Sequence, residues 1–131
     1  MDGRLVLLAL IVVITFVVAR DLEPARSTAQ LARERAADAV LVEVDRTQQC
    51  YYARRERYAA TVPSLQFARG RFMRTALQHE LDIHLRATDG GYVQRITGTG
   101  IDAVLERRGD EVVRLDVGDR AAPAPATGCT R

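Results

Sequence analysis

Between Ala25 and Val62 the chain contains neither glycine nor proline, and alanine, leucine, arginine and glutamate dominate. These residue types favour an α-helix, and Pro63 forces the chain out of it. Apolar or aromatic residues recur at every seventh position on one helix face, at Ala37, Val44, Tyr51 and Tyr58. The pattern predicts an extended amphipathic helix over residues 21–62. The helix is uninterrupted for about 50 Å after Pro24.

A helix of this length is too long to be one element of a compact chain of 131 residues. Its first half must therefore be covered by a membrane or by other subunits. Its second half is expected to pack on whatever the rest of the chain builds. The predicted helix–sheet contacts are Val44, Tyr51 and Tyr58.

The N-terminal residues 5–19 carry no charge, and they span roughly 22 Å against roughly 30 Å for a hydrocarbon core. In one interpretation they belong to a signal peptide that is cut before Arg20. In the other they are retained, and Arg4 and Arg20 extend to the membrane surfaces. Because a helical pattern resumes directly after Pro24, we favour a retained transmembrane or signal-anchor segment over residues 1–20. Its membrane and assembly contacts are Leu5, Leu8, Val12 and Phe16.

The charge at the start of the chain suggests an orientation. Arg4 and the amino terminus favour the cytoplasmic side, so everything after Arg20 would face outward. This predicts a single-pass membrane protein with an extracytoplasmic C-terminal domain, or an extracellular filament.

Residues 80–118 alternate apolar and polar side chains in four short segments separated by glycine-containing turns. The segments read ELDIHLRA, YVQRITG, IDAVLERR and EVVRLDV, and in the last of them Val113, Leu115 and Val117 are expected to face inward. They predict a four-stranded antiparallel meander whose one apolar face needs a cover. The C-terminal half of the long helix is the available cover, so the predicted fold class is α+β.

Composition argues against several functional classes. The net charge of +2 is too small to imply nucleic-acid binding by itself. His79 and His84 are poorly spaced for one helix face and no Cys-x-x-Cys pair is present, which argues against zinc. No histidine is expected near Cys50 to activate its thiol. We therefore expect no enzyme activity, no cofactor and no small-molecule substrate.

The two cysteines, Cys50 and Cys129, are far apart in sequence. In an extracytoplasmic domain the expected state is a disulfide, which would tie the extended tail of residues 119–131 to the helix. It would close a loop of about 80 residues, contributing roughly 4–5 kcal/mol. In a cytoplasmic domain the same residues would remain free thiols.

Residues 63–79 are expected to form a connecting loop, and within it the segment FARGRFMR mixes aromatic and basic side chains. This composition is typical of surfaces that contact single-stranded or duplex DNA. The candidate nucleic-acid contacts are Arg69, Arg71 and Arg74. The alternative is an ordinary solvated connecting loop or a short helix.

The organisation as a whole resembles type IV pilins and type II secretion pseudopilins. The segment CYYARRERYAATVPSL is similar to the passage of that family in which Tyr-Tyr, a further Tyr, a small-residue turn and a Leu follow one another. The segment DGGYVQRITGTGIDAVLERRGDEVVRLDV is similar to the family's strands and glycine turns. The resemblance implies a structural subunit, a minor pilin or pseudopilin, that assembles with other pilin-like subunits through its N-terminal helix.

The sequence departs from the family after Gly3, where the family carries an aromatic residue or Met, then Thr-Leu-Ile-Glu. The position of the Glu holds Leu8, or Ala9 if the alignment slides by one. Its absence suits a subunit at a filament tip, and it equally suits an anchored protein that never polymerises. The alternative function is thus a monomeric membrane-anchored or secreted cell-envelope binding protein that binds a partner through its sheet edge or its basic loop, with DNA as the candidate partner of the loop.

Overall fold

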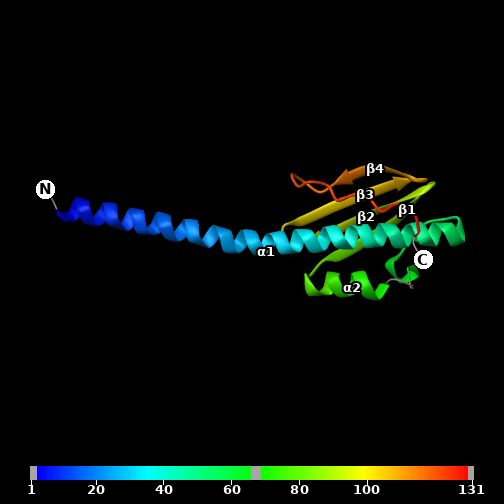
Figure 1. Ribbon diagram of the computed structural model, residues 1–131, viewed down its shortest axis with the longest axis horizontal. Helices are drawn as coiled ribbons and strands as arrows, with labels where there is room; N and C mark the ends of the chain where they lie inside the picture. The colour runs from blue at the N-terminus through cyan, green and yellow to red at the C-terminus, as the bar shows by residue number, and fades with distance from the viewer. Residues whose placement is uncertain (1–2, 66–68, 130–131) are drawn as a thin grey trace. The chain divides into compact units, whose positions relative to one another are not determined.

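The computed structural model describes residues 3–65 and 69–129, and the side chains of residues 4–5, 13–27 and 69 lie outside this description. Residues up to Ala32 form one compact unit and residues from Arg33 form a second. The elements are α1 (Gly3–Arg55), η1 (Val62–Ser64), α2 (Arg69–Gln78), β1 (Asp82–Thr88), β2 (Gly91–Gly98), β3 (Ile101–Arg108) and β4 (Glu111–Asp116). All of them except η1 are labelled in Figure 1.

The four strands form one antiparallel sheet in the order β1-β2-β3-β4, which confirms the predicted α+β class and the antiparallel meander. Each pair of neighbouring strands is joined by a tight turn. The turn glycines Gly90, Gly100 and Gly109 have positive φ angles of 74°, 68° and 59°, which side chains other than glycine adopt at a cost.

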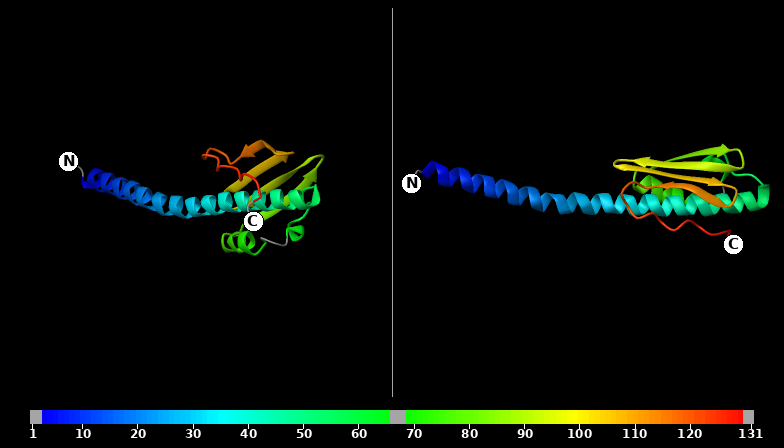
Figure 2. Two further views of the ribbon diagram at one scale, coloured as in Figure 1. Left: turned by 45° about the vertical axis from the view of Figure 1, so that its right-hand side comes forward. Right: turned by 90° about the horizontal axis from the view of Figure 1, so that it is seen from above.

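The second half of α1 lies along one face of the sheet, as Figure 2 shows from two sides. Small and branched side chains of α1 are buried in this layer, and they are Ala37, Val40, Leu41 and Val44. The sheet contributes Tyr92 and Ile96 from β2, and Ala103 and Leu105 from β3, all of them almost fully buried. The apolar face that the alternation predicted therefore does have a helical cover.

The long helix ends at Arg55, whereas the sequence predicted that it would continue to Val62. Glu56 has a φ of 57°, a left-handed conformation that ends helices. Both groups of the Gln48 side-chain amide bond to the backbone of Ala59, each at 2.8 Å. This pair folds the chain back onto α1, so a contact between distant residues overrides the local helical preference.

The predicted connecting loop of residues 63–79 contains a helix, α2. Phe72 and Ala76 lie one turn apart on it and are each 1% exposed, so one side of α2 belongs to the core. The basic residues in this segment made it appear solvent-exposed, so its buried face was not predicted from composition.

The prediction that Val113 faces inward is wrong. The pairing of β3 with β4 shifts register between Glu106 and Arg107, which is a β-bulge that reverses the facing of the residues before it. Val113 is consequently 45% exposed, and Val112 packs against the core in its place.

Candidate functional site: a clasp of helix, sheet and tail

A buried ion pair joins α1 to β3. The guanidinium of Arg107 donates from Nε to Asp45 Oδ1 at 2.6 Å and from Nη2 to Asp45 Oδ2 at 2.8 Å. The Arg107 side chain is 5% exposed and that of Asp45 is fully buried. The hydrogen bonds to Asp45 raise the pKa of Arg107, so this group stays charged. The two parallel bonds fix the helix against the sheet in one register.

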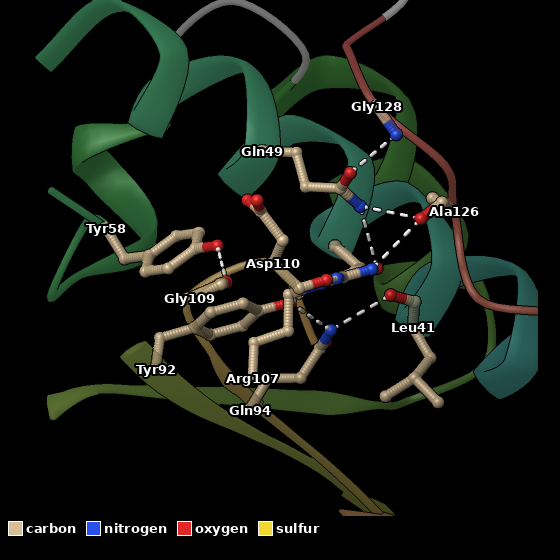
Figure 3. A network of polar contacts seen from close by, with 11 residues as sticks. Leu41, Gln49, Tyr58, Tyr92, Gln94, Arg107, Gly109, Asp110, Ala126 and Gly128 are labelled. Carbon is tan, nitrogen blue, oxygen red and sulfur yellow. Dashed lines mark hydrogen bonds and ion pairs between the residues drawn. The ribbon is translucent and has the colours of Figure 1, made fainter. Parts of the chain in front are cut away.

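Two polar side chains of β2 complete this network, which Figure 3 shows from close by. The Tyr92 hydroxyl donates to Asp45 Oδ1. Burial, followed by the charge of Asp45, raises the pKa of Tyr92 far above its usual range. Gln94 Nε2 donates to the Leu41 carbonyl at 2.9 Å. Helix and sheet are therefore joined by polar contacts as well as by apolar packing.

We call this network of Asp45, Tyr92, Gln94 and Arg107 the clasp, and the C-terminal tail joins it as its third side. Its Ala126 carbonyl accepts from Arg107 Nη2 at 3.0 Å and from Gln49 Nε2 at 2.8 Å. The backbone N–H of Gly128 donates to Gln49 Oε1 at 2.7 Å. We call residues 120–129 the strap, an extended segment that passes beside α1 at Gln49 (Figure 3).

The strap is fixed at its start as well. Arg120 Nη1 donates to the Glu34 carbonyl and to Asp38 Oδ1, both at 3.0 Å. Burial raises the pKa of Asp38, in spite of the opposing charge of Arg120.

At its far end the strap is fixed covalently. Cys50 and Cys129 form a disulfide with their Cα atoms 4.7 Å apart, which confirms the predicted pairing. Cys129 is exposed and Cys50 is half-buried, so the bond lies at the surface.

The strap depends on this bond. Fixing the backbone of residues 121–128, two of them prolines with φ already set, costs on the order of 6–14 kcal/mol. Three hydrogen bonds at Ala126 and Gly128 return about 1 kcal/mol each, or up to about 3 for the charged donor. Within residues 121–129 only Ala126 is buried. The hydrogen bonds alone therefore do not hold the strap in place.

The three predicted helix–sheet contacts differ in their burial and in their position. Val44 is fully buried in the core, whereas Tyr51 is half-buried with the Arg55 guanidinium 5.9 Å from its ring centre. Tyr58 is buried but lies after the helix, where its ring stacks on Tyr52 with centroids 4.6 Å apart and is tilted against Tyr92 with centroids 4.9 Å apart. Its hydroxyl donates to the Gly109 carbonyl at 2.6 Å.

Sequence reasoning missed Asp45, Tyr92 and Arg107, although a signal for the charged pair was present. Asp45 adjoins Val44 on the apolar helix face. Arg107 continues the inward alternation of Ile101, Ala103 and Leu105 on β3. Opposite charges on two faces that are predicted to meet indicate a buried ion pair.

The structure describes the side chains of two of the four predicted membrane and assembly residues. Leu8 and Val12 are 59% and 66% exposed, and the side chains of Leu5 and Phe16 lie outside the described set. Within residues 3–65 and 69–129, no helix combines the length and apolar character that a membrane crossing requires.

The predicted nucleic-acid residues lie on α2 rather than in a loop. Arg71 and Arg74 are exposed and three positions apart, so they share the side of α2 away from Phe72. The side chain of Arg69 lies outside the description. Among the described residues, no hydrogen bond or ion pair joins Arg71 or Arg74 to the clasp.

The polar groups of the clasp bond to one another and so link the helix, the sheet and the tail. Its acids and bases are paired with each other, and no group of three or more His, Cys, Asp or Glu residues suited to a metal ion occurs in the described part of the chain. No family model matches the chain, and neither does any curated protein or solved structure. Function is therefore inferred from the residues and contacts of the chain itself.

Proposed function

We propose that this protein is a structural subunit, a minor pilin or pseudopilin, of a type IV pilus-like or type II secretion-like filament. The observation that supports this most is that one helix, α1, carries two different surfaces. Its second half is buried against a four-stranded antiparallel sheet. Its N-terminal part presents large apolar side chains that are more than half exposed, at Val6, Leu7, Leu8, Leu10, Ile11 and Val12.

These apolar side chains need a cover from outside the chain. Each of the six is between 52% and 66% exposed, and together with Ala9 they leave no polar residue between positions 6 and 12 of the helix. A helix that is apolar all round is covered by lipid or by other helices. Packing of such segments from several subunits is the proposed mechanism of assembly.

The position of the missing Glu suggests a place in the filament. In pilins that residue pairs with the amino terminus of a neighbouring subunit, and here the position holds Leu8 or Ala9. A subunit at the tip of a filament has no neighbour above it that needs this partner. We propose a tip position, with other pilin-like subunits as the partners below.

The disulfide supports an extracytoplasmic location for the unit of residues 33–131, which we call the head. Disulfides persist in oxidising compartments and are rare in the cytosol. The proposed arrangement is an N-terminal segment in the membrane or in the filament core, with the head on the outer side.

The test is a comparison of two paired substitutions in the full chain expressed with its natural partners. The variant L8S/V12S removes two large apolar side chains from the proposed contact. We expect it to leave the membrane and filament fractions and to appear as a monomer, while the Tm of the head is unchanged. The control is Leu77→Ser, which changes an apolar side chain on α2 that is 73% exposed, and it should assemble normally.

Sequencing of the mature amino terminus provides the decisive second measurement. A terminus near Gly3 in the assembled fraction is the expected result. A soluble monomer that begins at Arg20 would contradict assembly and would favour the secreted envelope-binding protein instead.

The exposed arginines of α2 favour that second candidate, which binds DNA through Arg71 and Arg74. If it holds, fluorescence anisotropy with a labelled single-stranded oligonucleotide will show binding that weakens with salt. The double change R71A/R74A should then reduce the affinity several-fold. Salt-independent or unchanged binding would reject a role for these two residues.

A further inference from the structure

We propose that the Cys50–Cys129 disulfide is a redox-operated latch, and that its reduction releases residues 121–129 of the strap while the rest of the head stays folded. The strap is held at its start by Arg120, at its far end by the disulfide, and between them by three hydrogen bonds at Ala126 and Gly128. The latch acts on the head alone and does not depend on assembly.

Access to the bond is direct. Cys129 is exposed, Cys50 is half-buried, and the strap residues on the amino-terminal side of Cys129 are largely exposed as well. A thiolate can therefore reach a sulfur atom without prior unfolding of the sheet. This distinguishes the bond from a disulfide enclosed in a core.

The exchange is a balanced two-electron reduction by a dithiol, either a small molecule or a dithiol oxidoreductase. The attacking thiolate forms a mixed disulfide with the Cys129 sulfur, and the Cys50 sulfur leaves as a thiolate and takes up a proton. The second thiol of the reductant then closes its own disulfide and releases Cys129 as a thiol. Two protein thiols and one oxidised reductant are the products.

Loss of the bond frees the strap because its hydrogen bonds alone do not offset the ordering of its backbone, as described above. The Asp45–Arg107 pair remains, since both residues are held by α1 and β3. Release instead removes the Ala126 carbonyl from Arg107 and from Gln49. The donors of these two side chains then face solvent, where they can accept a carbonyl or carboxylate in its place.

The experiment measures backbone order in the full chain by NMR relaxation, in detergent, before and after reduction with dithiothreitol. For the non-proline residues of 121–129 we expect order parameters to fall from about 0.8 to below about 0.6. Residues 92–96 of β2 should keep their values. An ordered strap in the reduced protein would overturn the proposal, and so would loss of order in both segments.

Two controls separate the latch from general loosening. The variant C50S/C129S should show the mobile strap without reductant and should not respond to dithiothreitol. The rate of reduction of the native protein should lie within about tenfold of its rate in denaturant, because the bond is exposed. A rate more than a hundredfold slower would mean that the sheet must unfold first, and it would also overturn the proposal.

Discussion

Asp45 is a carboxylate that lies, fully buried, among the apolar side chains of a helix face. It is tolerated there because three side chains donate four hydrogen bonds to it, two from Arg107 and one each from Tyr92 and Gln49. A buried charge of this kind costs several kcal/mol unless it is paired and hydrogen-bonded. The residue therefore specifies which side of the helix meets which strand.

Removal of one member of the Asp45–Arg107 ion pair should destabilise the fold far more than removal of both. We expect Asp45→Ala to lower the free energy of unfolding by about 3–5 kcal/mol, because the Arg107 charge is left buried without a partner. The double variant D45L/R107M should recover a large part of this loss. Urea unfolding of each variant measures the difference.

An exposed ion pair provides the matched comparison. Arg95 and Asp102 also form two parallel hydrogen bonds, at 2.8 and 2.7 Å, but both side chains are more than half exposed. Asp102→Ala should leave the urea midpoint nearly unchanged. Equal losses at Asp45 and Asp102 would show that burial does not determine the effect.

Tyrosine ionisation should make the head sensitive to alkali. The chain has no lysine, so tyrosines dominate titration near pH 10. Burial raises the pKa of Tyr92 and of Tyr58, so the folded state holds protons that the unfolded state has released. Their stabilisation is complete below pH 10 and declines above it, by up to about 1.4 kcal/mol per pH unit for Tyr92, and Tyr58 acts in the same direction.

The measurement is the urea midpoint between pH 9 and 12 for the wild type and for Tyr92→Phe. The variant is expected to be less stable at neutral pH, because it loses the bond to Asp45, but to show a shallower decline above pH 10. Parallel curves for the two proteins would remove Tyr92 as the source of the alkaline effect.

At the scale of elements, two glycines should respond to the same substitution with opposite sign. A Cβ on Gly91, at the start of β2, would lie 1.9 Å from the backbone carbonyl oxygen of Arg107, so Gly91→Ala must force β2 and β3 apart. A Cβ on Gly70 in α2 would meet nothing within 4 Å, and alanine favours a helix. We expect loss of several kcal/mol for the first, since overpacking against backbone cannot relax, and a gain of about 0.5 kcal/mol for the second.

Thermal melts followed by circular dichroism compare these two variants with the wild type. A Tm that is unchanged for Gly91→Ala would mean that the two strands can separate at this point without cost.

The sheet was predictable from sequence because its information is local. Strict alternation and glycine turns determine where each strand begins, which side faces inward and how neighbouring strands pair. The bulge was not predictable, since Val112 and Val113 are the same residue type and only the pairing with Arg107 decides which of them is buried.

The end of α1 and the centre of the clasp depend on contacts across the chain. The helical preference of residues 56–62 yields to the bonds between Gln48 and Ala59, which no local pattern reveals. Tyr92 was assigned to a strand, but its partner Asp45 is 47 positions away. The disulfide was predictable because only two cysteines are present.

At the scale of the whole molecule, the core of the head lies entirely between Ala36 and Ala126. A fragment of residues 27–131 should therefore fold without the N-terminal segment, and it begins with Ser27 and Thr28, residue types that cap helices. We expect its Tm in the oxidised state to lie within a few degrees of that of the full chain. A fragment that melts without cooperativity would show that the head needs the preceding helix.

The disulfide also determines how the molecule carries force. A pull between α1 and any residue beyond Cys129 passes from Cys50 directly across the sulfur–sulfur bond. The 78 residues between the two cysteines, 51–128, with all four strands, then bear no tension. Without the bond the same pull could extend that segment by on the order of 250 Å. The oxidised head is thus inextensible along this line, and a single covalent bond shields the sheet from mechanical load.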